Sequence, residues 1–219
     1  MLRLDRETLN DRAYGALRQS LISGQFNPGQ VLVIRKLADT LGISTTPIRE
    51  ALQRLVAERI LEVKHNRSTA VPLLSARTFR ELVCIRSAIE GLAAEMAAER
   101  IGEPDLRTMR KAISGMDRAI AAGDGRGYLT LNEQFHFAVY RLAGAPILLN
   151  MIEDLWGRVG PYMHFLMETE SYVPQSNAYH RQIVAALEDR DGAAARASVV
   201  EDITAAAEAL LPRLTLRST

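Results

Sequence analysis

The segment from Leu37 to Leu52 constrains this chain more than any other part of the sequence. Its apolar residues recur at helical spacing on both sides of Gly42, which predicts a short helix, a tight turn and a second helix. The apolar positions expected to hold these helices together are Leu37, Ala38, Leu41, Ile43, Ile48, Ala51 and Leu52. Two helices joined in this way form a helix-turn-helix, whose second helix enters the major groove of DNA.

Small hydroxyl residues and one arginine stand at the start of the second predicted helix. Ser44 is expected to cap this helix, and Thr45, Thr46 and Arg49 lie outside its apolar face. Hydroxyl donors at the positive end of a helix suit phosphate, and an arginine suits the edge of a guanine. We therefore expect Ser44, Thr45, Thr46 and Arg49 to contact double-stranded DNA.

The flanking segments complete a winged helix-turn-helix over residues 1–73. The recognition helix is expected to continue to about Arg59. The other expected elements are a helix over 12–23, a strand over 31–34, and hairpin strands over 60–64 and 69–73. His65 and Arg67 lie at the tip of this small β-hairpin wing, where we expect them to reach DNA.

Residues 74–219 carry helix signals without strand signals. Glycine and proline breaks separate helices expected near 75–100, 104–122, 126–143, 146–168, 174–189 and 192–213, and Ser75 can cap the first of them. The chain is thus predicted to be mainly α, with an N-terminal winged helix-turn-helix and a C-terminal all-α helical bundle. Cys84, the single cysteine, is expected to be a small buried hydrophobe rather than a redox group.

The distribution of charge fits two domains with different roles. Residues 1–72 contain 11 basic and 7 acidic side chains, whereas residues 73–219 contain 16 and 19. A basic head on an acidic body favours DNA binding by the head. No apolar run approaches the roughly 20 residues of a membrane helix. Since the N-terminus also lacks an apolar signal core, we expect a cytoplasmic protein with no membrane partner.

Motifs in both parts of the chain resemble one family of regulators. The matching segments in the head are Pro28-Gly29-x-x-Leu32, Leu37-Ala38-x-x-Leu41-Gly42 and Thr46-Pro47-Ile48-Arg49-Glu50-Ala51-Leu52-x-x-Leu55, in the order and spacing of the GntR family. Those in the tail are Arg86-x-x-Ile89-Glu90, Phe135-His136 and His180-x-x-Ile183-x-x-Ala186-Leu187-x-x-x-Asp191, which resemble the FCD ligand-binding domain of the FadR subfamily. The resemblance implies a homodimeric transcriptional regulator, commonly a repressor, whose heads bind a palindromic operator. It also implies that the tail, residues 74–219, serves dimerisation and binds a small carboxylate or hydroxy-acid effector.

The head departs from the family pattern at three positions. Most relatives carry an arginine where this chain has Thr45, and often an acidic residue at Arg35 and a glycine at Ser68. A threonine cannot make the bidentate contact to guanine that an arginine makes. Arg35 either supplies a replacement contact to DNA or is a solvated surface charge, and the sequence leaves both alternatives open.

The resemblance also implies a metal site in the tail. Relatives place an aspartate and a histidine at positions matching Asn132 and His136, a second histidine at His180, and a third that corresponds by spacing to Asp202. Here the set offers two imidazoles, one carboxylate and one amide oxygen, which suits a divalent transition metal such as Zn, Ni, Mn or Fe. Two alternatives stay open: Asn132 binds the effector instead, or both histidines are core residues of a disused site. His164 is a further candidate for the cavity.

Arg86 is the expected effector-binding residue, because a guanidinium can hold a carboxylate by a forked contact. Its competing role is an ion pair with Glu90, one helical turn further on. An alternative function is that of a metal-free, ligand-independent dimeric regulator whose tail is only a dimerisation scaffold. A metal-dependent hydrolase is disfavoured, because the segment from Asn132 to His136 lacks the first histidine of the His-Glu-x-x-His pattern. We therefore expect no enzyme.

Overall fold

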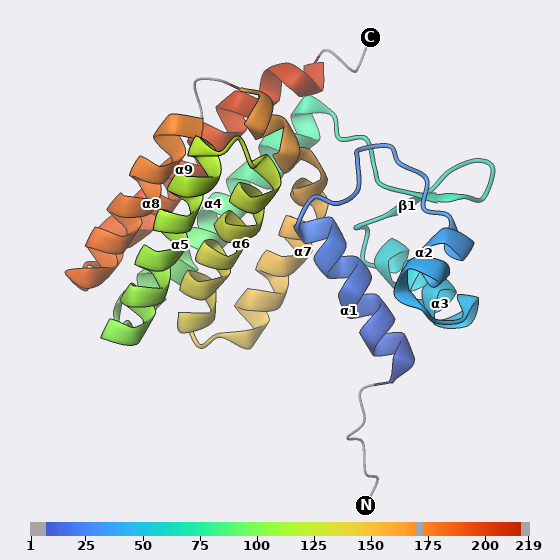
Figure 1. Cartoon of the computed structure of the whole chain (residues 1–219), viewed down its shortest axis with the longest axis horizontal. Coiled ribbons are helices and arrows are strands. Elements are labelled where there is room, and N and C mark those ends of the chain that lie inside the picture. The colour runs from blue at the N-terminus through green and yellow to red at the C-terminus, as the bar shows by residue number, and fades with distance from the viewer. Residues whose placement is uncertain (1–7, 170–172, 216–219) are drawn as a thin grey trace, which may run out of the picture. The chain divides into compact units, whose positions relative to one another are not determined.

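The helix-turn-helix predicted from the sequence is present. The computed structural model describes residues 8–169 and 173–215 (Figure 1). Helix α1 (Leu9–Ile22) opens with a reciprocal capping box between Thr8 and Asp11. Helix α2 (Ile34–Leu41) ends at Gly42, whose φ of 65° is left-handed and therefore suits a residue without Cβ. Helix α3 (Thr45–Ala57) begins three residues after Gly42.

The three helices of the head enclose one hydrophobic core. Its buried members are Ala13, Leu17, Leu21, Leu32, Ala38, Ile48, Ala51, Leu52, Leu55, Ile60, Leu61 and Val71. Complete burial of one such large apolar side chain contributes about 1.5–3 kcal/mol to folding. The prediction that Leu41 belongs to this core is wrong, since Leu41 is 38% exposed. It is the last residue of α2, one turn beyond the half-buried Leu37, at the margin of the core.

The wing is a short antiparallel hairpin. Strands β1 (Glu62–Val63) and β2 (Thr69–Ala70) pair Glu62 with Ala70 and Val63 with Thr69. The predicted strand over 31–34 is wrong, because only Val31 forms a bridge, to Ala70, and Ile34 already begins α2. The predicted hairpin is confirmed, with shorter strands than expected.

All six helices predicted for the tail are present with ends close to those expected. Their bounds are α4 (Ala76–Ala98), α5 (Glu103–Ala121), α6 (Gly125–Leu142), α7 (Pro146–Met163), α8 (Val173–Glu188) and α9 (Gly192–Thr215). Ser75 caps α4, since its hydroxyl accepts a hydrogen bond from the Thr78 amide. The helix expected over 146–168 is α-helical only to Met163 and continues as a 3-10 helix, η1 (His164–Glu168). Pro161, which lacks an amide donor, lies in the last turn of α7 before this change.

Five tail helices form a closed ring of packed neighbours. Helix α4 packs on α9, α9 on α8, α8 on α5, α5 on α6, and α6 back on α4. The interior of this bundle is not wholly apolar, because it buries a set of polar side chains: Arg86, Glu90, Asn132, His136, Ser176, Asn177, His180 and Asp202. Among the helices of the described residues, none has the length and hydropathy needed to cross a membrane.

The chain divides into two compact units. One comprises Met1–Leu73 with Trp156–Pro161, and the other comprises Leu74–Leu155 with Tyr162–Thr219. The assignment of functions to residues 1–73 and 74–219 stays a prediction.

Cys84 is exposed, so the expectation that it is a buried hydrophobe is wrong. It lies on α4 beside Ile85 and one or two turns from Ala88 and Leu92, all of which are exposed. The apolar character of this stretch therefore belongs to the outer face of α4 and not to the core.

Candidate DNA-binding face and candidate metal centre

The N-terminal end of α3 presents polar side chains to solvent. Ser44, Thr45, Thr46 and Arg49 are all exposed. Ser44 occupies the N-cap position, but its side chain makes no capping hydrogen bond, so the expected cap interaction is wrong. The first-turn amides of a helix have no partner within the helix, and without a side-chain cap they suit an anion such as phosphate.

The arginines of the head fall into two groups. Within the described residues, the exposed Arg35 and Arg49 have no ion-pair partner. Arg54, by contrast, is held by Glu58 with 3.1 Å between Nε and Oε1, and its guanidinium lies 3.7 Å from the ring centroid of Tyr14. The fold thus does not use the charges of Arg35 in the first turn of α2 and Arg49 early in α3, whereas Arg54 near the end of α3 is structural.

The tip of the wing contains a strained arginine. His65 and Arg67 are exposed, and Arg67 has a φ of 61°, the left-handed conformation. For a residue with a Cβ this conformation costs roughly 1–2 kcal/mol. The position that would suit glycine is therefore Arg67 rather than Ser68. An arginine that is kept at a strained position is consistent with a role for its charge.

Replacing Arg49 by alanine is expected to weaken operator binding by about 1–3 kcal/mol and to relax the preference for one base pair. The measurement is fluorescence anisotropy with the operator and with its single-base variants. Arg107→Ala, which removes an exposed arginine from α5, is the control. If Arg49→Ala bound its operator as tightly as the parent, α3 would not be the recognition helix.

Replacing Arg67 by glycine separates the charge of the wing from its backbone strain. We expect the thermal stability to be unchanged or higher, because glycine adopts a positive φ without penalty. DNA affinity should fall for all sequences, and the slope of log affinity against log salt should decrease by about one. An unaltered salt slope would remove Arg67 from the DNA contacts.

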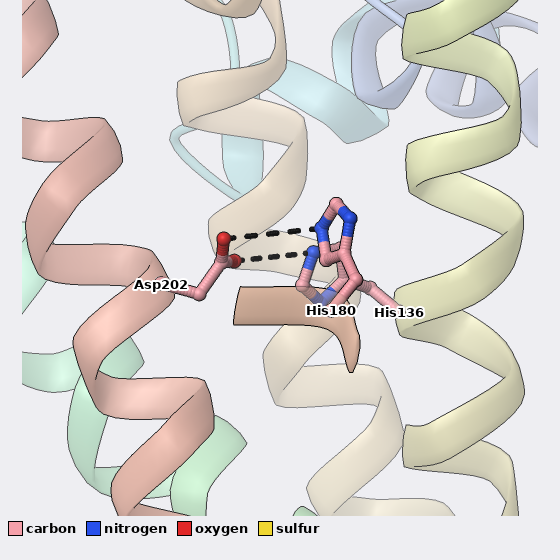
Figure 2. Close-up of side chains that lie close together, drawn as sticks. All are labelled: His136, His180 and Asp202. Atoms are coloured by element: carbon pink, nitrogen blue, oxygen red, sulfur yellow. Dashed lines mark ion pairs between the residues drawn. The ribbon is translucent and has the colours of Figure 1, made fainter. Parts of the chain in front are cut away.

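Three of the predicted metal ligands meet inside the tail bundle. His136 on α6, His180 on α8 and Asp202 on α9 are buried, and their ligand atoms lie within 4.8 Å of one another. Nε2 of His136 is 3.3 Å from Oδ2 of Asp202, and Nε2 of His180 is 3.8 Å from Oδ1 of the same carboxylate. Figure 2 shows both imidazoles directed at Asp202.

Two of these atoms lack a hydrogen-bond partner. Nε2 of His180 and Oδ1 of Asp202 are buried and make no hydrogen bond within the described part of the chain. Leaving a buried polar group unpaired costs about 1–3 kcal/mol, and folded proteins contain few such groups. A cation that binds both atoms would remove this cost, so the three residues fit a metal ion.

The ionisation of the site also suits a cation. Burial lowers the pKa of His180 to about 4, which leaves its imidazole neutral near pH 7. Burial alone would raise the pKa of Asp202, but the adjacent His136 and the nearby positive charges, including Arg86, lower it. A neutral imidazole and an ionised carboxylate are the forms in which these groups bind metals.

Asn132 and His164, the other residues predicted for this site, do not belong to the group of three side chains that meet. Asn132 is buried one turn before His136 on α6, and residues four apart share one face of a helix. Its role as a ligand stays a prediction. His164 begins η1 and does not belong to the group of three ligand residues.

Arg86 forms the ion pair that was its alternative role. Its Nε lies 2.6 Å from Oε1 of Glu90 and its Nη2 lies 3.3 Å from Oε2, and both side chains are buried. Glu90 also accepts a hydrogen bond of 2.5 Å from the hydroxyl of Tyr140, which lies 3.1 Å from Nδ1 of His136. Arg86 is thus connected to the site through Glu90 and Tyr140.

The residues that contact Nδ1 of the two histidines were not predicted from the sequence. Nδ1 of His180 lies 2.9 Å from Oδ1 of Asn177, whose Nδ2 donates to Oδ1 of Asp117 at 2.8 Å. Tyr140 stands four residues after His136, and Asn177 three before His180, so helical spacing could have indicated both. No sequence signal connects Asp117, which lies 60 residues before Asn177.

Comparisons with known proteins agree with this architecture. Residues 9–71 match the family described as bacterial regulatory proteins, gntR family, and residues 81–205 match the FCD domain. The HTH-type transcriptional regulator McbR of Escherichia coli K12 is 36% identical over 152 residues, which cover 69% of each chain. A probable D-xylose utilization operon transcriptional repressor of Paenarthrobacter nicotinovorans is 30% identical over 206 residues, 93% of this chain and 89% of that protein.

Solved structures show the same fold. A structure of E. coli McbR superposes with a TM-score of 0.85 at 29% identity and covers 97% of this chain and 99% of that one. A GntR regulator from Rhodococcus sp. RHA1 has a TM-score of 0.73 at 23% identity, covering 93% and 97% of the two chains.

A winged helix-turn-helix followed by an FCD domain defines a class of bacterial transcriptional regulators. This chain belongs to the GntR family, in its FadR-like subfamily with a C-terminal FCD domain. Its relatives are regulators that bind DNA operators, not enzymes, so the hydrolase alternative is dropped.

Proposed function

We propose that this GntR regulator senses a small carboxylate or hydroxy acid through a divalent transition metal held in its tail, residues 74–219. His136, His180 and Asp202 would bind the metal, with Asn132 as the fourth ligand candidate. Ligand binding would change the affinity of the heads, residues 1–73, for a palindromic operator. The observation that carries the proposal is the pair of buried, unsatisfied acceptors on His180 and Asp202.

The spacing of the donor atoms supports a metal of this kind. A tetrahedral ion with bonds of about 2.0–2.1 Å keeps its ligand atoms roughly 3.3–3.4 Å apart. Nε2 of His136 and Oδ2 of Asp202 are 3.3 Å apart. Nε2 of His180 and Oδ1 of Asp202 are slightly further apart, at 3.8 Å. Mixed imidazole and carboxylate donors suit Zn, Ni, Mn or Fe.

The balance of charge favours a ligand with one negative group at the metal. Arg86 and Glu90 neutralise each other, and Asp202 supplies a single negative charge among these groups. A divalent ion at this position would therefore leave one net positive charge at a buried site. When bound, the ion supplies open coordination positions, and a carboxylate with an adjacent hydroxyl suits such positions.

Arg86 is proposed to hold the other end of the effector. Glu90 engages its Nε and Nη2. An effector carboxylate that displaced Glu90 from Arg86 would also alter the Glu90 contact to Tyr140, which in turn contacts His136.

Two heads are needed to bind two half-sites of a palindrome, and the outer face of α4 is a candidate dimer interface. One exposed apolar stripe runs along this helix and consists of Cys84, Ile85, Ala88 and Leu92.

The occupant that fits this stripe is the α4 stripe of a second copy, because the charges at its two ends are complementary under a two-fold axis. Exposed Arg77 and Arg80 lie near the start of α4 and exposed Glu99 follows its end. In an antiparallel pair centred on Ala88, Arg77 lies opposite the partner's Glu99.

His136→Ala is expected to abolish tight metal binding, because it removes one of two imidazole ligands. The loss should exceed the roughly 10- to 100-fold that a change in the outer hydrogen bonds causes. Isothermal titration of zinc into metal-free protein measures it. Operator binding by the unliganded His136→Ala protein should be nearly unchanged, and its response to a panel of small carboxylates and hydroxy acids should be lost.

His65→Ala is the matched control, since His65 is exposed at the wing. It should retain metal binding, which is the property that this control tests. A parent protein that binds no metal and responds to no acid would instead favour the alternative of a tail that only supports dimerisation. Unchanged metal affinity in His136→Ala would move the site elsewhere.

Substitutions on α4 test the proposed dimer. Ile85→Asp places a charge in the apolar stripe and should convert the dimer to a monomer in light-scattering chromatography, with weaker operator binding. In a Cys84→Ser background, Ala88→Cys should form an intermolecular disulfide on oxidation, because residues at a two-fold axis come within bonding range. Arg107→Cys on α5 should not. A dimer that survives Ile85→Asp and shows no Ala88→Cys disulfide would exclude this face.

A further inference from the structure

Each histidine of the candidate metal centre is held at its second ring nitrogen by a chain of hydrogen bonds. Both chains end at a carboxylate, which can only accept hydrogen bonds when ionised. Because the donors and acceptors along each chain must alternate, the carboxylate at its end determines which nitrogen of the histidine carries a proton.

The chain behind His136 runs through Tyr140 to Glu90. Arg86 donates to Glu90 through two contacts of 2.6 and 3.3 Å, so Glu90 is an acceptor at this end of the chain. The hydroxyl of Tyr140 therefore donates to Glu90 at 2.5 Å, and its oxygen is left to accept from His136 at 3.1 Å. Nδ1 of His136 must be the donor.

The chain behind His180 runs through Asn177 to Asp117. Arg181 contacts both carboxylate oxygens of Asp117 at 3.0 and 2.7 Å. Since Asp117 accepts, the amide nitrogen of Asn177 must face it, at 2.8 Å. The amide oxygen then faces Nδ1 of His180 at 2.9 Å and accepts its proton. Nε2 of His180 is left without hydrogen and points at Asp202.

We propose that Tyr140 and Asn177 are positioning residues that hold a proton on Nδ1 of His136 and His180, so that both Nε2 atoms are presented to the metal beside Asp202. The purpose of this arrangement rests on the proposed function, but the position of the protons is a property of the metal-free protein. An imidazole protonated at Nε2 would have to change tautomer before it could bind.

The hydrogen bonds behind His180 connect this buried side chain to residues at the protein surface. Asp117 and Arg181 are about half exposed, whereas His180 is completely buried. Asp117→Asn leaves every proposed ligand in place, but it replaces an obligate acceptor by an amide. Asn177 can then turn its own amide over and donate to Nδ1 of His180, which moves the proton of His180 to Nε2.

Nitrogen-15 NMR of the imidazoles in metal-free protein tests the placement of the protons directly. We expect Nδ1 of both His136 and His180 to be protonated in the parent protein. In Asp117→Asn, the His180 signal should shift towards the tautomer protonated at Nε2, and the His136 signal should not. A parent protein in which His180 carries its proton at Nε2 would overturn the inference.

Zinc titration calorimetry tests the consequence. Tyr140→Phe and Asp117→Asn should each bind zinc about 10- to 100-fold more weakly than the parent. Tyr128→Phe is the matched control for the first, because it removes a buried hydroxyl of α6 that meets Ser176 at 2.5 Å. Glu188→Gln is the control for the second, because it breaks an exposed ion pair with Arg110 of 2.7 Å on the same two helices, α5 and α8. Both controls should bind zinc like the parent.

The outcomes separate this inference from the proposed function. A parent protein that binds no divalent metal, but carries both protons on Nδ1, overturns the proposed function and supports the placement of the protons. Tight zinc binding that is equal in all four variants overturns the inference and leaves the proposed function standing. Should Tyr140→Phe fail to fold, the exposed Asp117→Asn change still decides the result, since no buried group is altered in it.

Discussion

Two buried acceptors, Nε2 of His180 and Oδ1 of Asp202, point at each other across 3.8 Å without a hydrogen bond between them. A protein interior seldom retains such a pair, because each unpaired polar group costs about 1–3 kcal/mol. The closed ring of helices brings the pair together from α8 and α9 and places His136 of α6 beside it. Adjacent helices thus enclose a group of residues that fits a cation. This constraint connects the fold of the tail to its proposed sensing function.

The departure of this chain from its family's ligand pattern has a simple electrostatic interpretation. The resemblance implies a carboxylate in relatives at the position of Asn132 and an imidazole at the position of Asp202. Here the carboxylate stands on α9 instead of α6, so the number of negative charges among the four positions is unchanged. Asp202 lies against both histidines, so a single carboxylate at this position can serve the same ion. Under the proposed function, the exchange would preserve the negative charge available to a divalent cation, although it changes the helix that supplies it.

Much of the fold could be predicted because it depends on local patterns. The turn at Gly42 requires a left-handed residue, and the tail helices end at glycine or proline breaks. The errors concern properties that depend on neighbours distant in sequence. Cys84 and Leu41 have apolar side chains, but whether such a residue is buried depends on what packs against it. The missing side-chain bond of Ser44 likewise depends on side-chain geometry that its sequence position does not specify.

The candidate ligands of the site were predicted, but the residues that hydrogen-bond to the two histidines were not. The histidines and Asp202 followed from the family resemblance, and their meeting in the bundle agrees with that expectation. Tyr140 and Asn177 lie within one helical turn of the histidines and could have been considered as partners. Asp117 could not, because only the packing of α5 on α8 brings it to Asn177. Long-range packing therefore determines the outer hydrogen bonds, whereas the candidate ligands could be proposed from the family resemblance.

The most direct test of the central claim is a crystal structure of the zinc-loaded protein with data collected on both sides of the zinc absorption edge. The account predicts one anomalous peak per chain, located between His136, His180 and Asp202 and about 2.0–2.2 Å from the nearest atom of each. A protein saturated with zinc that shows its anomalous peak elsewhere, with the three side chains still facing one another, would contradict it.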